Sequence, residues 1–348
     1  KGSFRLEAPL PSLEQAGRDR NVRRAMESLP GFQDRVARLD RAASWERGKL
    51  SRQAVDRLYG KQVAMSASRM DKYKSCHFSY FMRYGLEAEP RKPAGFTAPE
   101  YGTFVHYVLE HVLQDRMFAK DTPAPQGEEE LAAWKKKLRR LTKKAVDRYV
   151  AEELGGLEGQ SARFRYLFRR LLRSVQAVVD NVAEELACSQ FKPVSFELGF
   201  GRSKENDGEL SLPPVELTCQ GVTISITGFV DRVDGWEEDG RLHLRVVDYK
   251  TGRKTFDLTE VWNGLGLQML LYLFTLEEKG RERYGLPVEG DGGLYLPARE
   301  AVIRAGRSIS DGELQKRVDK ELTRSGLVVD DRRVLDAMEP QGPGGYRF

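Results

Sequence analysis

The sequence predicts an α/β or α+β fold in which long helices surround a β-hairpin, a helix and a final strand. Three observations support this prediction. Apolar residues recur at helical spacing through the first half, apolar and polar residues alternate as in strands after residue 195, and another helical stretch separates the last two strand-like segments. With 348 residues, 40% of them apolar and 31% charged, the chain can bury a substantial core.

The N-terminal segment, residues 1–60, is charged, amphipathic and interrupted by prolines, and we expect it to form a helical connector from a region upstream. A helix should then begin at Ser66 or Ser68, because either residue is a suitable N-cap. This helix should run past Phe81, and Pro90 should end the stretch.

Three more helices are expected in the first half of the chain. An apolar stripe at three- and four-residue spacing marks the first, over residues 102–113. Two prolines predict a loop at 120–125. Two long helices should follow at 128–153 and 161–188, separated by a pair of glycines.

The last two of these helices are strongly basic. Residues 131–176 hold thirteen Lys or Arg against four Asp or Glu, a local excess of nine positive charges in a chain whose net charge is +5. Such a surface attracts phosphates through the release of counterions. A solvated helix face explains the charge alone equally well.

The second half is expected to form the sheet. Alternating apolar and polar residues predict strands, and a helical pattern separates the last two of them. The expected elements are strands at 195–200, at 222–226 continued by 228–233, and at 242–249, a polar turn at 236–240, a helix over 259–279 and a short strand at 293–296.

The three cysteines, Cys76, Cys188 and Cys219, are widely spaced and form no CxxC pair. This sparse, odd-numbered set argues against a disulfide framework and against a self-contained zinc site. We expect Cys188 and Cys219 to be buried thiols. No apolar run approaches the length of a membrane span, and no signal peptide opens the chain, so a cytoplasmic location is expected.

Two acidic residues and a lysine are placed to share one site. If the two strands around the turn at 236–240 form a hairpin, Asp231 and Asp248 come close together, and Lys250 shares the face of Asp248. Neighbouring carboxylates repel one another unless a cation neutralises them, and oxygen ligands suit Mg²⁺ or Mn²⁺. Taken alone, the D-x-K pattern is also typical of a solvated Asp–Lys pair at a strand end.

Two further pairs strengthen the metal hypothesis. Gln268 and Tyr272 lie one helical turn apart directly after the lysine strand, although they also suit the polar edge of a packed helix. His106 could complete a metal shell, and Glu110, one turn later, could hold that imidazole or a water. A single helical histidine is more often structural.

The order of these motifs resembles the RecB-family branch of PD-(D/E)XK nucleases, and most closely the C-terminal nuclease domain of the AddB subunit of bacterial AddAB helicase–nucleases. The flanking stretch from Ser66 to Phe81 is similar too, and the resemblance covers residues 61–348. It implies a restriction-endonuclease-like core, a small mixed sheet flanked by helices, with large helical insertions. The motifs are G-x-x-x-H-x-x-x-E from Gly102, G-F-x-D-R-x-D from Gly228, V-D-Y-K-T-G from Val247 and Q-x-x-x-Y from Gln268.

The resemblance also implies roles for individual residues. Lys250 would be the catalytic lysine, and Gln268 and Tyr272 would shape the site and the DNA path. Glu197 matches an acidic position of the family, although we favour a surface glutamate there. The implied metal ligands are His106, Asp231, Asp248 and the backbone carbonyl of Tyr249.

Cys76 matches the first of four cysteines that hold a [4Fe–4S] cluster in such proteins, but the other three are missing from this sequence. We therefore expect the cluster in a full-length parent and not in this chain. A helicase-like region upstream and an AddA-like helicase–nuclease partner are implied as well. The sequence contains no G-x-x-x-x-G-K-[ST] phosphate loop, so we predict no ATP hydrolysis by the chain itself.

The leading hypothesis is a Mg²⁺-dependent exonuclease domain that hydrolyses single-stranded DNA in double-strand-break repair and recombination. The alternative is a non-catalytic DNA-binding scaffold that docks a partner helicase. A hydrolase of small phosphoesters is a third possibility, disfavoured by the basic helices.

Overall fold

The computed structural model describes residues 49–89, 98–156, 162–201, 211–306 and 308–339, with a few residues between 21 and 37. The chain divides into two compact units, Lys1–Arg57 and Leu58–Phe348. Most of the predicted connector, residues 1–60, lies outside the described residues, apart from α4 (Arg52–Tyr59) at its end. The other elements belong to the second unit.

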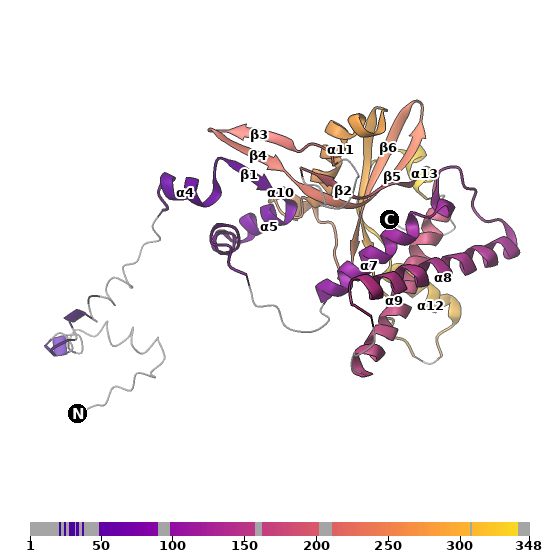
Figure 1. Cartoon of the computed structure of the whole chain (residues 1–348), viewed down its shortest axis with the longest axis horizontal. Helices are drawn as coiled ribbons and strands as arrows, with labels where there is room; N and C mark the ends of the chain where they lie inside the picture. The colour runs from indigo at the N-terminus through magenta and orange to yellow at the C-terminus, as the bar shows by residue number, and fades with distance from the viewer. Residues whose placement is uncertain are drawn as a thin grey trace. The chain divides into compact units, whose positions relative to one another are not determined.

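A five-stranded mixed sheet forms the centre of this unit (Figure 1). Its strand order is β2-β5-β6-β7-β8, and β6 and β7 run parallel while the other neighbours are antiparallel. This arrangement confirms the predicted α/β class with a small mixed sheet. The strands are β2 (Lys192–Phe200), β5 (Gly228–Glu238), β6 (Arg241–Lys250), β7 (Val288–Pro297) and β8 (Ser325–Val328).

The predicted hairpin joins β5 to β6, but its turn is shorter than expected. Asp239 and Gly240 have φ of 51° and 74°, which is the left-handed geometry of a two-residue hairpin turn. Trp236 therefore lies inside β5, paired with His243, and not in a polar turn. Polar residues at 237 and 238 made the turn look longer, because they lie at the more exposed end of the hairpin.

A second, three-stranded sheet corrects another expectation. In it β4 (Val222–Ile226) pairs with β1 (Gln62–Met65) in parallel and with β3 (Val215–Cys219) antiparallel. The prediction that residues 228–233 continue the strand at 222–226 is wrong, because β5 belongs to the other sheet. A side chain at Gly228 would lie 2.7 Å from the Phe200 ring, so this glycine lets the chain pass closely from one sheet to the other.

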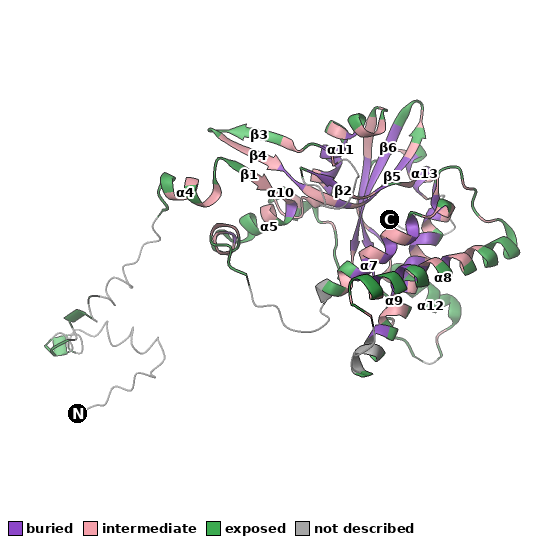
Figure 2. Cartoon of the chain, viewed as in Figure 1, coloured by how far each residue is buried: buried purple, intermediate pink, exposed green. Residues whose placement is uncertain are grey.

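Helices cover both faces of the central sheet. On one face α7 buries Phe104, Val108 and Val112 completely and shares a core with Val247 and Tyr249 of β6. Figure 2 shows buried residues concentrated along α7, β5 and β6. The predicted helices at 102–113, 128–153 and 161–188 are confirmed with small shifts, as α7 (Ala98–Leu113), α8 (Gly127–Glu152) and α9 (Ala162–Cys188).

On the other face α11 (Gln268–Tyr284) packs Met269 and Leu273 against Val246 of β6. The prediction of one continuous helix over 259–279 is wrong. A short helix, α10 (Leu258–Trp262), is separated from α11 by a break at residues 263–267. Gly264 and Gly266 in this break have φ of 76° and 64°, which an α-helix cannot include.

The helix predicted from Ser66 past Phe81 is also interrupted. Ser66 does cap α5 (Ala67–Ser75), accepting a hydrogen bond from Arg69 N, but Cys76 is extended at φ −163° and ends that helix. The Cys76 thiol accepts a hydrogen bond from Ser79 N and so caps the next helix, α6 (His77–Tyr80). The remaining elements are the π-helical turn η1 (Phe81–Gly85), the 3₁₀ turn η2 (Arg116–Phe118), α12 (Asp311–Glu321) and α13 (Arg332–Met338).

All three cysteines are free and exposed, so the expectation that Cys188 and Cys219 are buried is wrong. Cys188 ends α9, and Cys219 ends the edge strand β3, and both positions face solvent. The role of Cys76 in a cluster stays a prediction. No helix among the described residues is both long enough and apolar enough to cross a bilayer.

Candidate active site

The hairpin brings Asp231 and Asp248 together at the end remote from its turn. Arg232 pairs with Val247, and one further step in the same register sets Asp231 opposite Asp248. Tyr249 N donates a 2.8 Å hydrogen bond to Asp231 Oδ2 across the two strands. The side chains of Asp231 and Asp248 are only 12% and 3% exposed, so both carboxyl groups are withdrawn from water.

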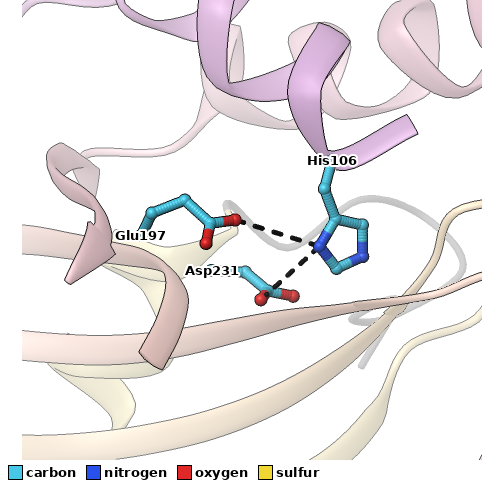
Figure 3. A group of neighbouring side chains, drawn as sticks. All are labelled: His106, Glu197 and Asp231. Atoms are coloured by element: carbon cyan, nitrogen blue, oxygen red, sulfur yellow. Dashed lines mark ion pairs between the residues drawn. The ribbon is translucent and has the colours of Figure 1, made fainter. Parts of the chain in front are cut away.

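His106 reaches this pair from α7 and is joined by Glu197 of β2 (Figure 3). Its Nδ1 lies 3.6 Å from Asp231 Oδ1 and 4.0 Å from Glu197 Oε1. Its Nε2 lies 3.1 Å from the carbonyl oxygen of Tyr249. One ligand atom each from His106, Glu197 and Asp231 lies within 4.8 Å of the others, which is close enough for a shared metal ion.

Glu197 corrects the expectation of a surface glutamate. Its side chain is 17% exposed and faces His106. Its backbone has φ of 45° in the middle of β2, a conformation that costs a non-glycine residue about 1–3 kcal/mol. Strand alternation could not reveal this orientation, because a left-handed residue departs from the regular strand. Only the family resemblance pointed to the position.

Lys250, Gln268 and Tyr272 form a chain of contacts around Asp248. Lys250 forms an ion pair with Asp248 Oδ2 and donates a 3.4 Å hydrogen bond to Gln268 Oε1. Gln268 Nε2 donates to Asp248 Oδ1 at 2.6 Å and to Tyr272 Oη at 3.0 Å. The first turn of α11 thus holds the carboxylate that the hairpin supplies. Glu110 is half-buried, and the carboxylates facing His106 Nδ1 are those of Glu197 and Asp231.

The charges of this cluster do not balance. Burial raises the pKa of Asp231 well above its usual range, and the nearby carboxylates of Asp248 and Glu197 raise it further. Burial also raises the pKa of Asp248, and the Lys250 ammonium offsets only part of that effect. Burial lowers the pKa of His106, so its imidazole is neutral at neutral pH and keeps a lone pair for a metal. A divalent cation would neutralise the excess negative charge.

The donor set fits such a cation. Carboxylate and carbonyl oxygens suit Mg²⁺ and Mn²⁺, and an imidazole nitrogen is a better ligand for Mn²⁺ than for Mg²⁺. Two ligands at right angles on bonds of about 2.1 Å lie about 3 Å apart. The 3.6 Å between His106 Nδ1 and Asp231 Oδ1 is somewhat longer than this separation. The 3.1 Å contact of His106 Nε2 with the Tyr249 carbonyl oxygen is a hydrogen bond that orients the ring and leaves Nδ1 toward the carboxylates.

A second cluster of buried charges lies next to the site and contacts it through the Tyr249 hydroxyl. Arg232 donates to the Tyr249 hydroxyl at 3.0 Å and to Asp234 Oδ2 at 3.0 Å. Arg245 donates to Asp234 at 2.8 Å and to Glu185 of α9 at 2.7 Å. Sequence reasoning assigned no role to these residues, although the charged pattern inside an apolar strand was a signal. The network holds Tyr249, whose backbone contacts both Asp231 and His106.

Residues 64–337 match the family model of the PD-(D/E)XK nuclease superfamily, and the chain belongs to this superfamily. The membership confirms the resemblance inferred from the ordered motifs. It also agrees with the observed core, in which a mixed sheet carries the acidic pair and helices flank it.

Relatives narrow the class further, since several are named as the B subunit of an ATP-dependent helicase/deoxyribonuclease. The protein of Caldanaerobacter subterraneus subsp. tengcongensis is 33% identical over 290 residues, covering 82% of this chain and 24% of its own length. That of Clostridium novyi is 32% identical over 294 residues (83% and 24%), and that of Clostridioides difficile is 30% identical over 304 residues (86% and 25%). The chain spans about a quarter of the length of these curated relatives.

Proposed function

We propose that residues 61–348 form a metal-dependent nuclease domain that hydrolyses phosphodiester bonds of single-stranded DNA. The observation that carries this proposal is the buried acidic cluster around Asp231 and Asp248 with Lys250 in contact. The superfamily and the deoxyribonuclease names of the relatives support the substrate class. Within a longer protein, an AddA-like helicase would feed DNA to this domain during double-strand-break repair.

We assign the metal, Mg²⁺ or Mn²⁺, to a definite set of ligands. When bound, it would lower the pKa of a coordinated water and stabilise negative charge on the phosphate. Glu197 joins the ligands named from the motifs, because it faces the same histidine nitrogen as Asp231. The assigned ligands are His106, Glu197, Asp231 and Asp248. The carbonyl oxygen of Tyr249, also named from the motifs, lies against the other ring nitrogen of His106.

The remaining residues of the site orient the Asp248 carboxylate and the reacting groups. Lys250 places its Nζ beside Asp248, where it can orient a water nucleophile and attract a phosphate oxygen. Gln268 fixes the rotamer of Asp248 through Oδ1, and Tyr272 fixes the amide of Gln268. These contacts keep the carboxylate in one orientation before substrate arrives.

Asp248→Ala and Lys250→Ala test the assignment. Single-stranded DNA degradation is measured with Mg²⁺ and with Mn²⁺, and both variants should lose activity while retaining the fold by circular dichroism. Matched controls are Asp121→Ala and Lys316→Ala, which change the same residue types at exposed positions. Undiminished cleavage by Asp248→Ala would show that the site is wrongly assigned. A parent chain that binds DNA but never cleaves it with either metal would favour the scaffold alternative.

A further inference from the structure

A basic cavity of about 170 Å³ opens beside Lys250. It lies between the loop that follows β6, the end of β7 and the segment joining α12 to β8. Its charged lining consists of four cations and one carboxylate, namely Lys250, Arg253, Lys254, Arg299 and Glu321. Cations thus outnumber the carboxylate within the lining, and ion pairs of Lys250 with Asp248 and of Lys254 with Glu260 offset part of this charge.

Tyr295 connects the cavity to the catalytic lysine. This residue is 2% exposed, lies opposite Asp248 in the β6–β7 register, and lines the cavity. Lys250 Nζ lies 5.6 Å from the centroid of its ring, and Lys254 Nζ lies 6.0 Å from the same centroid. Both ammonium groups are thus held over one aromatic ring. A ligand in the cavity would lie next to the reacting centre.

The carboxylate of the lining cannot balance the guanidinium groups around it. Arg253 and Arg299 both donate to the same oxygen of Glu321, at 2.7 and 2.8 Å. Arg299 Nε is buried and has no hydrogen-bond partner within the described part of the chain. Glu321 therefore leaves part of the hydrogen-bonding capacity of Arg299 unused. Planar guanidinium groups match the oxygens of a phosphate.

We propose that this cavity binds a backbone phosphate of the DNA strand, adjacent to the phosphate that is hydrolysed. The proposal rests on the nuclease function proposed above. An acidic centre repels a polyanion until a metal is bound, so a cationic subsite beside it is needed to hold the strand in place. Lys250 lines both regions and joins them.

Two substitutions with opposite expected effects test the subsite. Affinity for a fluorescent single-stranded oligonucleotide is measured by anisotropy, in chelator and at several salt concentrations. Lys254→Gln should weaken binding several-fold and make the slope of log K against log salt shallower by about 0.7. Glu321→Gln should tighten binding, because it removes the negative charge and frees two guanidinium groups. If the role of Glu321 is purely structural, Glu321→Gln will not bind the oligonucleotide more tightly than the parent.

The control is Arg281→Gln on α11, which removes an exposed positive charge outside the cavity lining and should leave the slope near that of the parent. Because Glu321→Gln breaks two ion pairs, the fold of this variant is checked by thermal melting. Lys254 should tolerate substitution, since its one ion pair in the described structure is with exposed Glu260 at 3.4 Å. Unchanged affinity in Lys254→Gln would overturn the subsite.

Oligonucleotides with one uncharged methylphosphonate linkage identify the phosphate that is bound. One linkage position should cost the parent affinity but cost Lys254→Gln little. Equal losses at every position, or binding of inorganic phosphate without any effect on DNA affinity, would overturn the proposal. Since these measurements contain no metal, their failure is distinct from failure of the nuclease assignment, which depends on cleavage by Asp248→Ala.

Discussion

Two clusters of buried charge are centred on the same hairpin and differ in how their charges balance. In the first, the carboxylate of Asp248 contacts the ammonium group of Lys250, whereas Glu197 and Asp231 lie beside the imidazole of His106. In the second, the acids are surrounded by arginines: Asp234 and Glu185 pair with Arg232, Arg245 and Arg324. In the second cluster each acid is ion-paired and the arginines outnumber the acids three to two, whereas the first retains an excess of negative charge.

This difference distinguishes a cluster that binds a metal from one that stabilises the fold. Buried carboxylates with matching guanidinium groups form a rigid unit whose disruption leaves an uncompensated charge. Buried carboxylates without enough counter-charge repel one another, so the folded chain loses stability there and gains an affinity for cations. The two clusters should therefore respond in opposite ways to the loss of one acid.

The largest expected effect is on catalysis. Asp231→Asn keeps the acceptor for Tyr249 N but removes a charged metal ligand, so metal-dependent cleavage of single-stranded DNA should fall on the order of 10³-fold, equivalent to several kcal/mol. Single-turnover rates with saturating Mn²⁺ measure the effect. Activity within a few-fold of the parent would remove Asp231 from the metal site.

Stability should separate the two clusters most clearly. Asp234→Asn removes the charge that pairs with both Arg232 and Arg245 and leaves them Glu185 alone, so we expect the free energy of unfolding to fall by about 3–5 kcal/mol. Asp231→Asn, the same substitution three residues earlier, should raise it by about 1 kcal/mol in chelator, because it relieves repulsion. Urea denaturation compares them. A change of the same sign and size in both variants would contradict the distinction.

The pH dependence of the free energy of unfolding tests the second, arginine-rich cluster. Burial alone would raise the pKa of Glu185, but Arg324, Arg245 and Arg232 outweigh burial and lower it from 4.5 to about 2. The lowered folded pKa means that Glu185 stabilises the fold above about pH 5 and loses this effect as the pH falls toward 2. The contribution is on the order of 3 kcal/mol.

Glu185→Gln should therefore be less stable than the parent at pH 7 and should show a shallower loss of stability between pH 5 and pH 2. Denaturation curves at a series of pH values test this expectation. Parallel curves for parent and variant over that range would mean that Glu185 does not carry the acid dependence.

The smallest effect concerns the strained backbone of Glu197. Glu197→Gly removes a side chain from a residue with φ of 45° and also removes one repelling carboxylate, so unfolding should require about 1 kcal/mol more free energy. Mn²⁺ affinity, measured by calorimetry, should fall. Glu87→Gly is the matched control, since exposed Glu87 has φ of 54° outside the site. Equal metal affinity in both variants would show that Glu197 is not a ligand.

Local pattern predicted much of this protein from the sequence. The three long helices, the β5–β6 hairpin and the order of the motifs all depend on residues close together in the chain, where periodicity and turn chemistry act directly. The positions of Asp231, Asp248 and Lys250 followed from strand alternation and one hairpin. The break between α10 and α11 was missed, although two glycines signalled it.

Only the tertiary structure decided which charges are balanced. Arg324 reaches Glu185 across 139 residues of sequence, and His106 reaches Tyr249 across 143. Neither partnership has a local signature, because electrostatic pairing depends on distance in space and on burial. For the same reason the sequence could not show that Glu197 turns inward, since its orientation depends on a left-handed residue that the surrounding sheet and α7 hold in place. A carboxylate's surroundings, which only the fold assembles, determine whether it supports the structure or binds a metal.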